Sequence, residues 1–259
     1  GDIHPETRVV SAVFGQLDVV EKSLDYVRDS YPLPAWMNGI SSYSIWWIIA
    51  HYDWYQYHGD LKYLREQRDY LVNLLELLSR FVGADGQERL DGQRFLDWPT
   101  VGDPDAVAVG LQALLVLGFG MGSELCRALG EDDVAEEAAD FAELVASFTG
   151  VTSKRKSACA LAALAGITDF QVANKSILAA DPCRDMSTFY GYYVLEARAK
   201  AGDYLGCMRL IRDYWGAMLD LGATTFWEHF ELDWAHGAGR IDEIVPPGLR
   251  DIHKDCGDH

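Results

Sequence analysis

The strongest constraint on the fold is a helical spacing of apolar residues that recurs along most of the chain and stops only at turn-forming residues. Between residues 7 and 29, apolar side chains recur at steps of three and four, as one buried helical face requires. These side chains are Val10, Val13, Phe14, Leu17, Val20, Leu24 and Val27. Only 151–152 and 224–227 have the composition of short extended pieces. The pattern therefore predicts an all-α fold.

Glycine and aspartate residues divide this pattern into about eight or nine helices joined by short turns. After the first, the predicted helices are 41–58, 61–82, 104–129, 132–149, 153–165, 169–179, 184–201 and 204–220. Gly59 ends one of these helices, and Asp60 caps the next. The helices pair into hairpins of about 40 to 55 residues without a tight repeat, which favours a toroid of helical hairpins over a regular solenoid. Because no Pro- or Ser-rich linker divides the chain, residues 1–259 are predicted to form a single domain.

The charge balance limits the classes of partner. A net charge of −18 repels nucleic acid phosphates and anionic membranes, whereas neutral sugars are indifferent to it. No apolar run approaches the length of a membrane span, so no such span is expected. The chain opens with Gly1 rather than Met and has no signal peptide, which indicates a processed, trimmed or excised piece. Cytoplasm and periplasm therefore remain equally open as its compartment.

The cysteines and the common motifs indicate no cofactor. The cysteines are odd in number, widely spaced and without a CxxC pair: Cys126, Cys159, Cys183, Cys207 and Cys256. We expect free, mostly buried thiols rather than a zinc site or a disulfide framework. The sequence has no nucleotide-binding glycine motif, no GxSxG and no HExxH. We therefore expect neither a metal ion nor a cofactor.

Acidic residues beside tryptophan are the candidates for chemistry. Glu228 lies within Thr224–Phe230, flanked by Trp227 at the junction of a helix and a loop. A carboxyl group in such a semi-apolar cleft is suited to acid or base catalysis, although a helix-capping glutamate on the surface is equally compatible with the spacing. Asp97 and Trp98 lie in a Gly- and Asp-rich loop, where a ring and a carboxylate can together hold a sugar. A loop anchored by a buried Trp is the simpler interpretation of those two residues.

Two further segments carry weaker signals. Asp2, His4 and Glu6 alternate at the start of the chain, where a frayed terminus is the simplest expectation. A dense aromatic cluster surrounds the helix predicted over 41–58, and its members are Trp36, Tyr43, Trp46, Trp47, Tyr52, Trp54, Tyr55 and Tyr57. A helix cannot direct all of these rings at one core. We expect about half to form a partly buried belt and others to line a pocket or an interface. Trp36 and Tyr43 are the candidates of this cluster for binding a substrate.

At these same segments the chain resembles bacterial α-L-rhamnosidases of glycoside hydrolase family 78. Gly1-Asp2 resembles the end of an acidic Trp-x-Gly-Asp motif that precedes the first long helix of the family's barrel. The run from Ile40 to Asp60 resembles the family's aromatic helix, which ends in Tyr-x-x-Tyr-Gly-Asp. Phe95–Trp98 resembles its Phe-Gly-Asp-Trp loop, and Thr224–Glu228 resembles its Thr-Thr-x-Trp-Glu motif. The order of the four stretches, which span residues 1 to about 235, adds to their weight.

The resemblance implies an (α/α)6 six-hairpin toroid, incomplete at both ends, and an inverting glycosidase acting on terminal α-L-rhamnosides. An inverting enzyme protonates the leaving oxygen with one carboxyl group and activates water with another. Glu228 would be the general base, and Asp2 would hold rhamnose hydroxyls. Asp97, Trp98 and Trp227 would line the sugar subsite, and Tyr43 stands where many members have Trp. The implied partners are a rhamnose-containing glycoside or polysaccharide and the remainder of the same polypeptide.

Three departures from the family's pattern leave alternatives open. The family's general acid lies upstream of the Gly-Asp pair, outside this chain, and that group typically contributes about 10²–10⁴-fold to the rate. The family's last helices would follow near His259, and Tyr43 and Pro99 differ from the common pattern. Another six-hairpin carbohydrate enzyme, or a non-catalytic sugar-binding relic, therefore remains possible.

Overall fold

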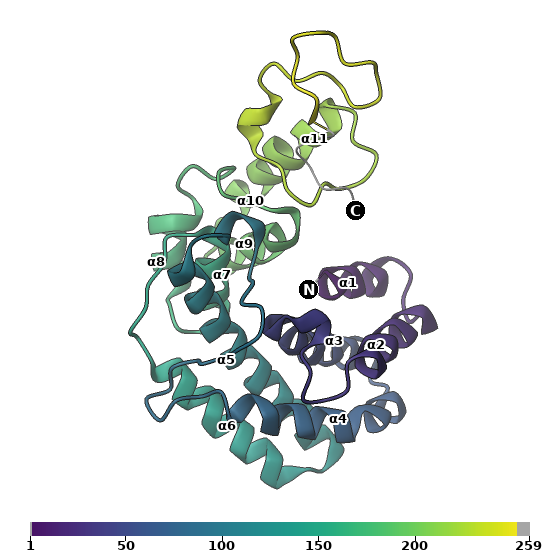
Figure 1. The fold of residues 1–259 in the computed structure, drawn as a ribbon, viewed down its shortest axis with the longest axis vertical. Coiled ribbons are helices and arrows are strands. Elements are labelled where there is room, and N and C mark those ends of the chain that lie inside the picture. The colour runs from purple at the N-terminus through teal and green to yellow at the C-terminus, as the bar shows by residue number, and fades with distance from the viewer. Residues whose placement is uncertain (1, 253–259) are drawn as a thin grey trace. The chain divides into compact units, whose positions relative to one another are not determined.

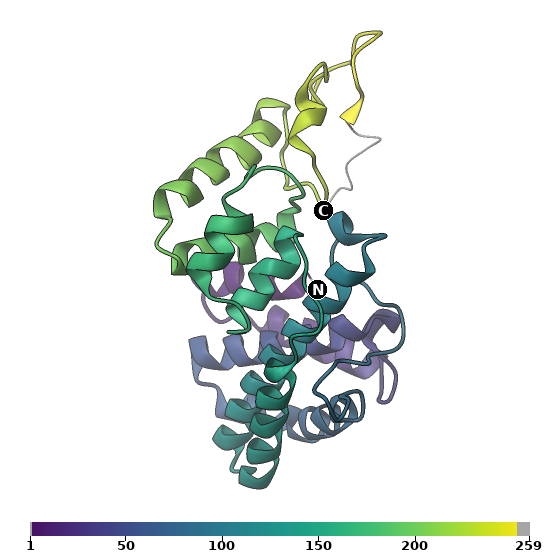
Figure 2. The same ribbon diagram turned by 90° about the vertical axis from the view of Figure 1, so that its left-hand side faces the viewer.

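A computed structural model describes residues 2–252 of the chain (Figures 1 and 2). These residues are predominantly helical and contain only isolated β-bridges in place of strands, which confirms the all-α prediction. The chain divides into two compact units, each described below by itself. Unit 1 comprises Gly1–Leu96 and Val107–Thr152, and unit 2 comprises Asp97–Ala106 and Ser153–His259. The assignment of residues 1–259 to one domain stays a prediction.

Unit 1 contains the first six helices of the chain and most of its apolar core. They are α1 (Ile3–Val13), α2 (Asp18–Ser30), α3 (Ser41–His58), α4 (Leu61–Ser79), α5 (Pro104–Leu129, which begins in unit 2) and α6 (Asp132–Ser147). A 3-10 turn, η1 (Met37–Gly39), precedes α3. The side chain of Asp60 caps α4 by accepting the backbone N–H of Tyr63, as predicted.

Helix α3 is the centre of unit 1 and explains the density of aromatic residues in the sequence. It packs against α1 and against α4 (Figure 1). Because neighbours cover most of its circumference, Trp46, Trp47 and Trp54 are all buried. Tyr57, in its last turn, is exposed. The expected division of the cluster into a buried belt and more accessible rings is therefore what this helix shows.

Helix α5 corrects the expectation that no apolar stretch approaches the length of a membrane span. Its composition and length would also suit a membrane span, because one 18-residue window has a mean hydropathy of 1.8. Gly110, Gln112 and Gly118 interrupt the apolar stretch, so no uninterrupted apolar run marks it in the sequence. Within the described residues, 72% of that window is buried inside the protein, as in the core helix of a folded domain.

The single long helix predicted over 7–29 is wrong. Two helices occupy this region, and Gly15, with φ of +79°, lies in the turn between them. The apolar spacing continued across the turn, but the buried face did not. Val13 is 65% exposed and Phe14 is 67% exposed, whereas Val20 and Leu24 of α2 are buried.

Unit 2 is built from shorter helices. They are α7 (Lys156–Leu164), α8 (Phe170–Ala173), α9 (Thr188–Lys200), α10 (Tyr204–Leu210) and α11 (Gly216–Asp220), with α7 packed against α9 (Figures 1 and 2). The π-helical turns η3 (Asn174–Leu178) and η4 (Ile211–Trp215) continue α8 and α10. The 3-10 turns η2 (Trp98–Thr100) and η5 (Leu232–Ala235) lie in the loops. No strand forms at 224–227.

The described cysteines are free thiols, as predicted. Cys126, Cys159 and Cys207 are buried, and Cys183 is half-buried. Burial raises the pKa of the Cys126 and Cys159 thiols to about 11, so both are protonated and unreactive near neutral pH. Cys256 lies outside the described residues.

Substitution of Gly86 by alanine is expected to destabilise unit 1. Gly86 has φ of +82°, and a Cβ there would overlap the backbone oxygen of Leu144 in α6. Left-handed strain alone costs about 1–3 kcal/mol, and the overlap adds to it. Gly59→Ala is the matched control, because Gly59 has φ of +65° but open space around it. In urea unfolding, the free energy of unfolding should be clearly lower for Gly86→Ala than for Gly59→Ala. Equal losses of stability in the two variants would contradict the role of the α6 contact.

Candidate functional site

The segment around Glu228 has no regular structure but is held firmly within unit 2. Trp227 is 2% exposed and packs edge-on against the buried Phe230, with ring centroids 5.3 Å apart. The hydroxyl of buried Tyr214 donates to the backbone oxygen of Phe230 at 2.8 Å. Two buried aromatic rings therefore anchor the backbone on either side of Glu228.

The beginning of α9 fixes the same segment from a second direction. Ser187 and His229 form an isolated antiparallel bridge. The hydroxyl of Thr188 donates to the backbone oxygen of Trp227, and its amide donates to that of Glu228 at 3.5 Å. Ser187 also caps α9 by accepting the amide of Tyr190. The position of the Glu228 backbone thus depends on a helix that starts 40 residues earlier in the chain.

Trp98 provides a direct polar contact to the Glu228 side chain. Its indole Nε1 donates to Oε1 of Glu228 at 2.6 Å, a short hydrogen bond to a carboxylate. The ring itself is 48% exposed. Asp97 is buried and begins η2, with its Oδ1 accepting the amide of Trp98 at 2.9 Å. Unit 2 therefore joins two candidate segments that are 130 residues apart in sequence.

Two titratable neighbours of Glu228 were missed by the sequence analysis. Burial lowers the pKa of His229, against the opposing effect of the Glu228 charge, so the imidazole is neutral near pH 7. Burial, with the charge of Asp185 added to it, raises the pKa of Glu231. Only their position beside Glu228 could have pointed to either residue, because their burial is a property of the fold.

The loop before α9 is held by two basic residues that the sequence analysis also missed. Arg155 bridges Asp103 and Asp185, with N–O distances of 3.0 and 2.8 Å. The buried ammonium group of Lys156 donates to the backbone oxygens of Asp181 and Arg184, at 3.0 and 2.8 Å. Burial lowers the pKa of Lys156. The available signal was an Arg-Lys pair at the start of an otherwise apolar helix.

Asp2 lies in unit 1, directly before α1. Its backbone oxygen accepts the amide of Glu6 at 3.3 Å. The expectation of a frayed terminus is wrong for the residues that follow. His4 is buried, and its Nε2 lies 2.7 Å from Oδ2 of Asp53. Arg8 donates to the same oxygen at 2.6 Å.

The charge of Asp53 is what holds this contact between α1 and α3. Burial by itself would raise the pKa of Asp53, but the hydrogen bonds and charges of His4 and Arg8 outweigh burial and lower it. Asp53 is therefore ionised at neutral pH. The helix that follows Asp2 is consequently anchored to the core helix of unit 1.

Trp36 and Tyr43, the other candidates in unit 1, have different surroundings. Trp36 is buried, and its Nε1 donates to Oδ1 of Asp91 at 2.6 Å. Its ring also limits the space beside Gly92: a Cβ atom added to this glycine by substitution would lie 2.7 Å from Cδ1 of Trp36. Trp36 thus anchors the loop that follows α4. Tyr43 is half-buried in the first turn of α3.

Comparison with known proteins identifies the fold. No family model and no curated protein matches the sequence. Among solved structures, the chain is similar to a GH78 family rhamnosidase of Bacillus sp. GL1, with a TM-score of 0.73 and 21% identity over 88% of this chain. It is also similar to a rhamnosidase from Klebsiella oxytoca with rhamnose bound, with a TM-score of 0.73 and 20% identity over 88% of this chain.

The chain spans 28% of the length of the Bacillus protein and 51% of the length of the Klebsiella protein. At this level of identity the match establishes a fold and not an activity. The fold class and the resemblance predicted from the sequence are both confirmed at that level. The chain has the all-α fold found in part of each of these two rhamnosidases.

Proposed function

We propose that this chain belongs to an inverting glycoside hydrolase that acts on terminal α-L-rhamnosides, with Glu228 as the general base. The observation that carries the proposal is the hydrogen bond from Trp98 to Glu228, in a chain whose fold matches rhamnosidases. It joins a carboxylate suited to act as the base and an accessible aromatic face suited to stack on a sugar ring. The substrate would be a rhamnose-containing glycoside or polysaccharide.

The geometry around Glu228 suits the activation of water. The indole N–H of Trp98 orients the carboxylate through Oε1, and the attacking water would bind to the same carboxylate. As the water oxygen forms its bond to the anomeric carbon, Glu228 takes up one of its protons, and the glycosidic oxygen leaves from the opposite face with a proton from the general acid. A backbone fixed by α9, Trp227 and Phe230 keeps the base in place without reorganisation.

The remaining candidates receive supporting roles in this proposal. Trp98 offers the accessible ring for stacking, and Asp97 holds the turn that presents it. Buried Trp227 would line the subsite beside Glu228 in unit 2. Trp36 and Tyr43 stay predicted sugar-binding residues of unit 1. Asp2 would bind rhamnose hydroxyls. The resemblance assigns the general acid to residues upstream of Gly1, supplied by the remainder of the polypeptide.

Hydrolysis of p-nitrophenyl α-L-rhamnoside tests the proposal. The chain and a form extended upstream along the natural polypeptide should be compared, with p-nitrophenyl α-L-arabinoside and β-D-glucoside as control substrates. We expect the extended form to prefer the rhamnoside, and early NMR spectra to show the β-anomer of free rhamnose, as inversion requires. An extended form that is folded but inactive on rhamnosides would reject the substrate assignment, and an α-anomer would reject the mechanism.

Substitution of Trp98 by phenylalanine is expected to lower kcat for the rhamnoside while preserving much of the ring for stacking. The change removes the donor to Glu228 but adds no charge or bulk. A hydrogen bond to a charged group contributes about 1.5–3 kcal/mol when buried. Because Trp98 is half exposed, we expect a smaller loss, roughly five- to tenfold in kcat, with little change in KM. An unchanged kcat would show that this hydrogen bond does not orient the base.

A further inference from the structure

Unit 1 contains an open groove between the end of α2 and one face of α4. Its volume is about 790 Å³, within the range of roughly 300–1,000 Å³ that is typical of ligand pockets. Arg28, Asp29 and the turn Pro32–Pro34 line one side. A stripe of residues at steps of three and four lines the other side, from Glu66 of α4 to Arg80, which caps the C-terminus of that helix. A helix of this length presents a stripe about 20 Å long.

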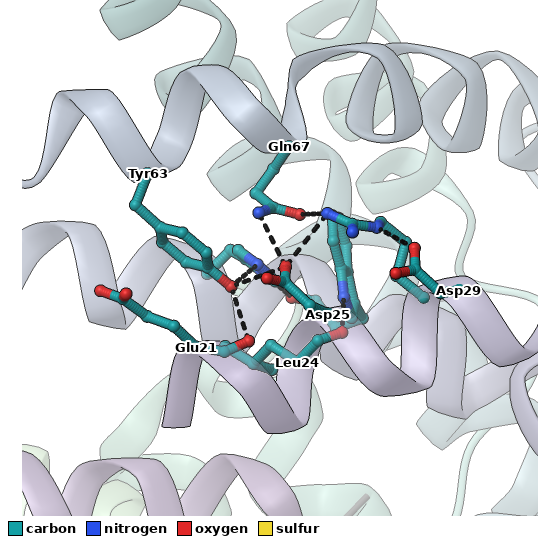
Figure 3. Close-up of polar contacts among 9 residues, drawn as sticks. Glu21, Leu24, Asp25, Asp29, Tyr63 and Gln67 are labelled. Carbon is teal, nitrogen blue, oxygen red and sulfur yellow. Dashed lines mark hydrogen bonds and ion pairs between the residues drawn. The ribbon is translucent and has the colours of Figure 1, made fainter. Parts of the chain in front are cut away.

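Hydrogen bonds within unit 1 fix two of the side chains that line the groove. Arg28 donates to Asp25, Asp29 and Gln67, and Figure 3 shows this network between α2 and α4. Tyr70 is half-buried, with its hydroxyl donating to the backbone oxygen of Tyr31 at 3.2 Å. Its ring meets Trp47 edge-on at 4.9 Å. Arg28 and Tyr70 are therefore held in place before any ligand arrives.

The charges that line the groove are largely paired with one another. Asp29 lies 2.7 Å from Arg28, and Glu76 lies 2.7 Å from Arg80. Asp69 is paired with Arg68, which lies outside the groove. Glu66 makes no ion pair with any residue between 2 and 252. The side-chain nitrogen of Asn73 donates to the backbone oxygen of Asp69. The side-chain oxygen of Asn73 is then the atom that can accept a hydrogen bond from a ligand.

The resulting surface combines apolar faces with hydrogen-bond acceptors. Tyr70, Leu77 and the prolines of the turn supply the apolar area, and Glu66 and Asn73 supply acceptors for hydroxyl groups. The unpaired Glu66 carboxylate, in a chain of net charge −18, opposes an anionic ligand. An apolar platform flanked by acceptors suits the C–H face and the hydroxyl groups of an uncharged sugar chain.

We propose that this groove is a second carbohydrate site, which binds a neutral oligosaccharide at residues of α2 and α4 in unit 1. It is built from residues other than those assigned to the Glu228 site. Only the choice of sugar rests on the proposed function. Such a site would retain a polymeric substrate on the protein between cleavage events, because two linked contacts raise the effective concentration of each.

Amide chemical-shift mapping of the full chain tests the proposal, with a neutral tetrasaccharide of α-linked L-rhamnose as the probe. We expect shifts at α4 residues of the groove. A Glu66→Ala/Asn73→Ala variant should weaken this binding roughly tenfold, since it removes two hydroxyl acceptors. Both positions are exposed, and alanine favours the helix. Arg65→Ala, on α4 but outside the groove, and Glu228→Gln should leave the groove affinity unchanged.

Other results would separate the groove proposal from the proposed function. Shifts confined to Trp98 and Glu228 would overturn the groove proposal and leave the proposed function standing. Groove binding by a protein that is inactive on rhamnosides would support this site and reject the function. Equal binding by the double variant, or stronger binding of a cationic peptide or of hexagalacturonate than of the neutral sugar, would overturn the assignment of the ligand.

Discussion

Replacing Glu228 by glutamine in the upstream-extended form is expected to lower kcat for p-nitrophenyl α-L-rhamnoside by about 10²–10⁴-fold, the usual contribution of a general base. Glutamine has nearly the same volume as glutamate, and its amide oxygen can still accept the indole N–H of Trp98. It cannot take a proton from water. The loss should therefore appear in kcat, whereas the Kd for rhamnose changes little. Steady-state kinetics and calorimetric binding of rhamnose would measure the two effects separately.

Glu231→Gln is the matched control for this prediction. Glu231 lies three residues further along the same segment, is half-buried, and takes no part in the hydrogen bond with Trp98. Its substitution should leave kcat close to that of the unaltered protein. A large loss in Glu231→Gln with full activity in Glu228→Gln would transfer the role of base to Glu231. Equal large losses would indicate that the segment, and not one carboxylate, is required.

Acid is expected to destabilise unit 1 through His51. This residue of α3 is 2% exposed, and its Nδ1 lies 2.8 Å from the backbone oxygen of Trp47. That oxygen can only accept, so Nδ1 carries the proton and Nε2 is the acceptor facing the Tyr63 hydroxyl at 3.4 Å. Burial lowers the pKa of His51 from 6.5 to about 3. The folded protein therefore keeps His51 neutral through most of the acidic range.

The sign of the effect follows from proton binding. Below about pH 6.5 the unfolded chain protonates His51 and the folded chain does not, so each proton taken up favours unfolding. The stabilisation is complete above pH 6.5 and is lost progressively as the pH falls towards 3. At about 1.4 kcal/mol per pH unit, the loss from this residue reaches about 3 kcal/mol near pH 4.5. Urea unfolding at pH 7, 5.5 and 4.5 would measure it.

His51→Gln supplies the comparison, since glutamine retains a donor for the Trp47 oxygen but cannot be protonated. The variant should be less stable than the unaltered protein at pH 7 because it loses the ring packing between Trp47 and His51. Its unfolding free energy should nevertheless fall less steeply with acid, because the carboxylates contribute equally to both proteins. Parallel slopes for the two proteins would contradict the assignment of the acid sensitivity to His51.

Most of the local structure could be predicted from the sequence. The bounds of α3 and α5 agree with the predicted ranges, because Gly59, Asp60 and Pro104 are local signals for helix ends. The cap of α4 by Asp60 depends on an amide only three residues away. The prediction of one helix over 7–29 was wrong because the apolar spacing continues across the turn at Gly15. The left-handed backbone of that glycine is seen only in the structure.

The sequence by itself thus determined the fold class, the helices and the segments that carry the candidate residues, since helical periodicity and capping act over a few residues. The tertiary structure decided which of those segments meet. The contact between Trp98 and Glu228 spans 130 residues, and no local pattern encodes it. Burial likewise decided the neutral state of His51 and the support of the α9 loop by Lys156. These properties depend on desolvation by distant parts of the chain, which exists only after packing.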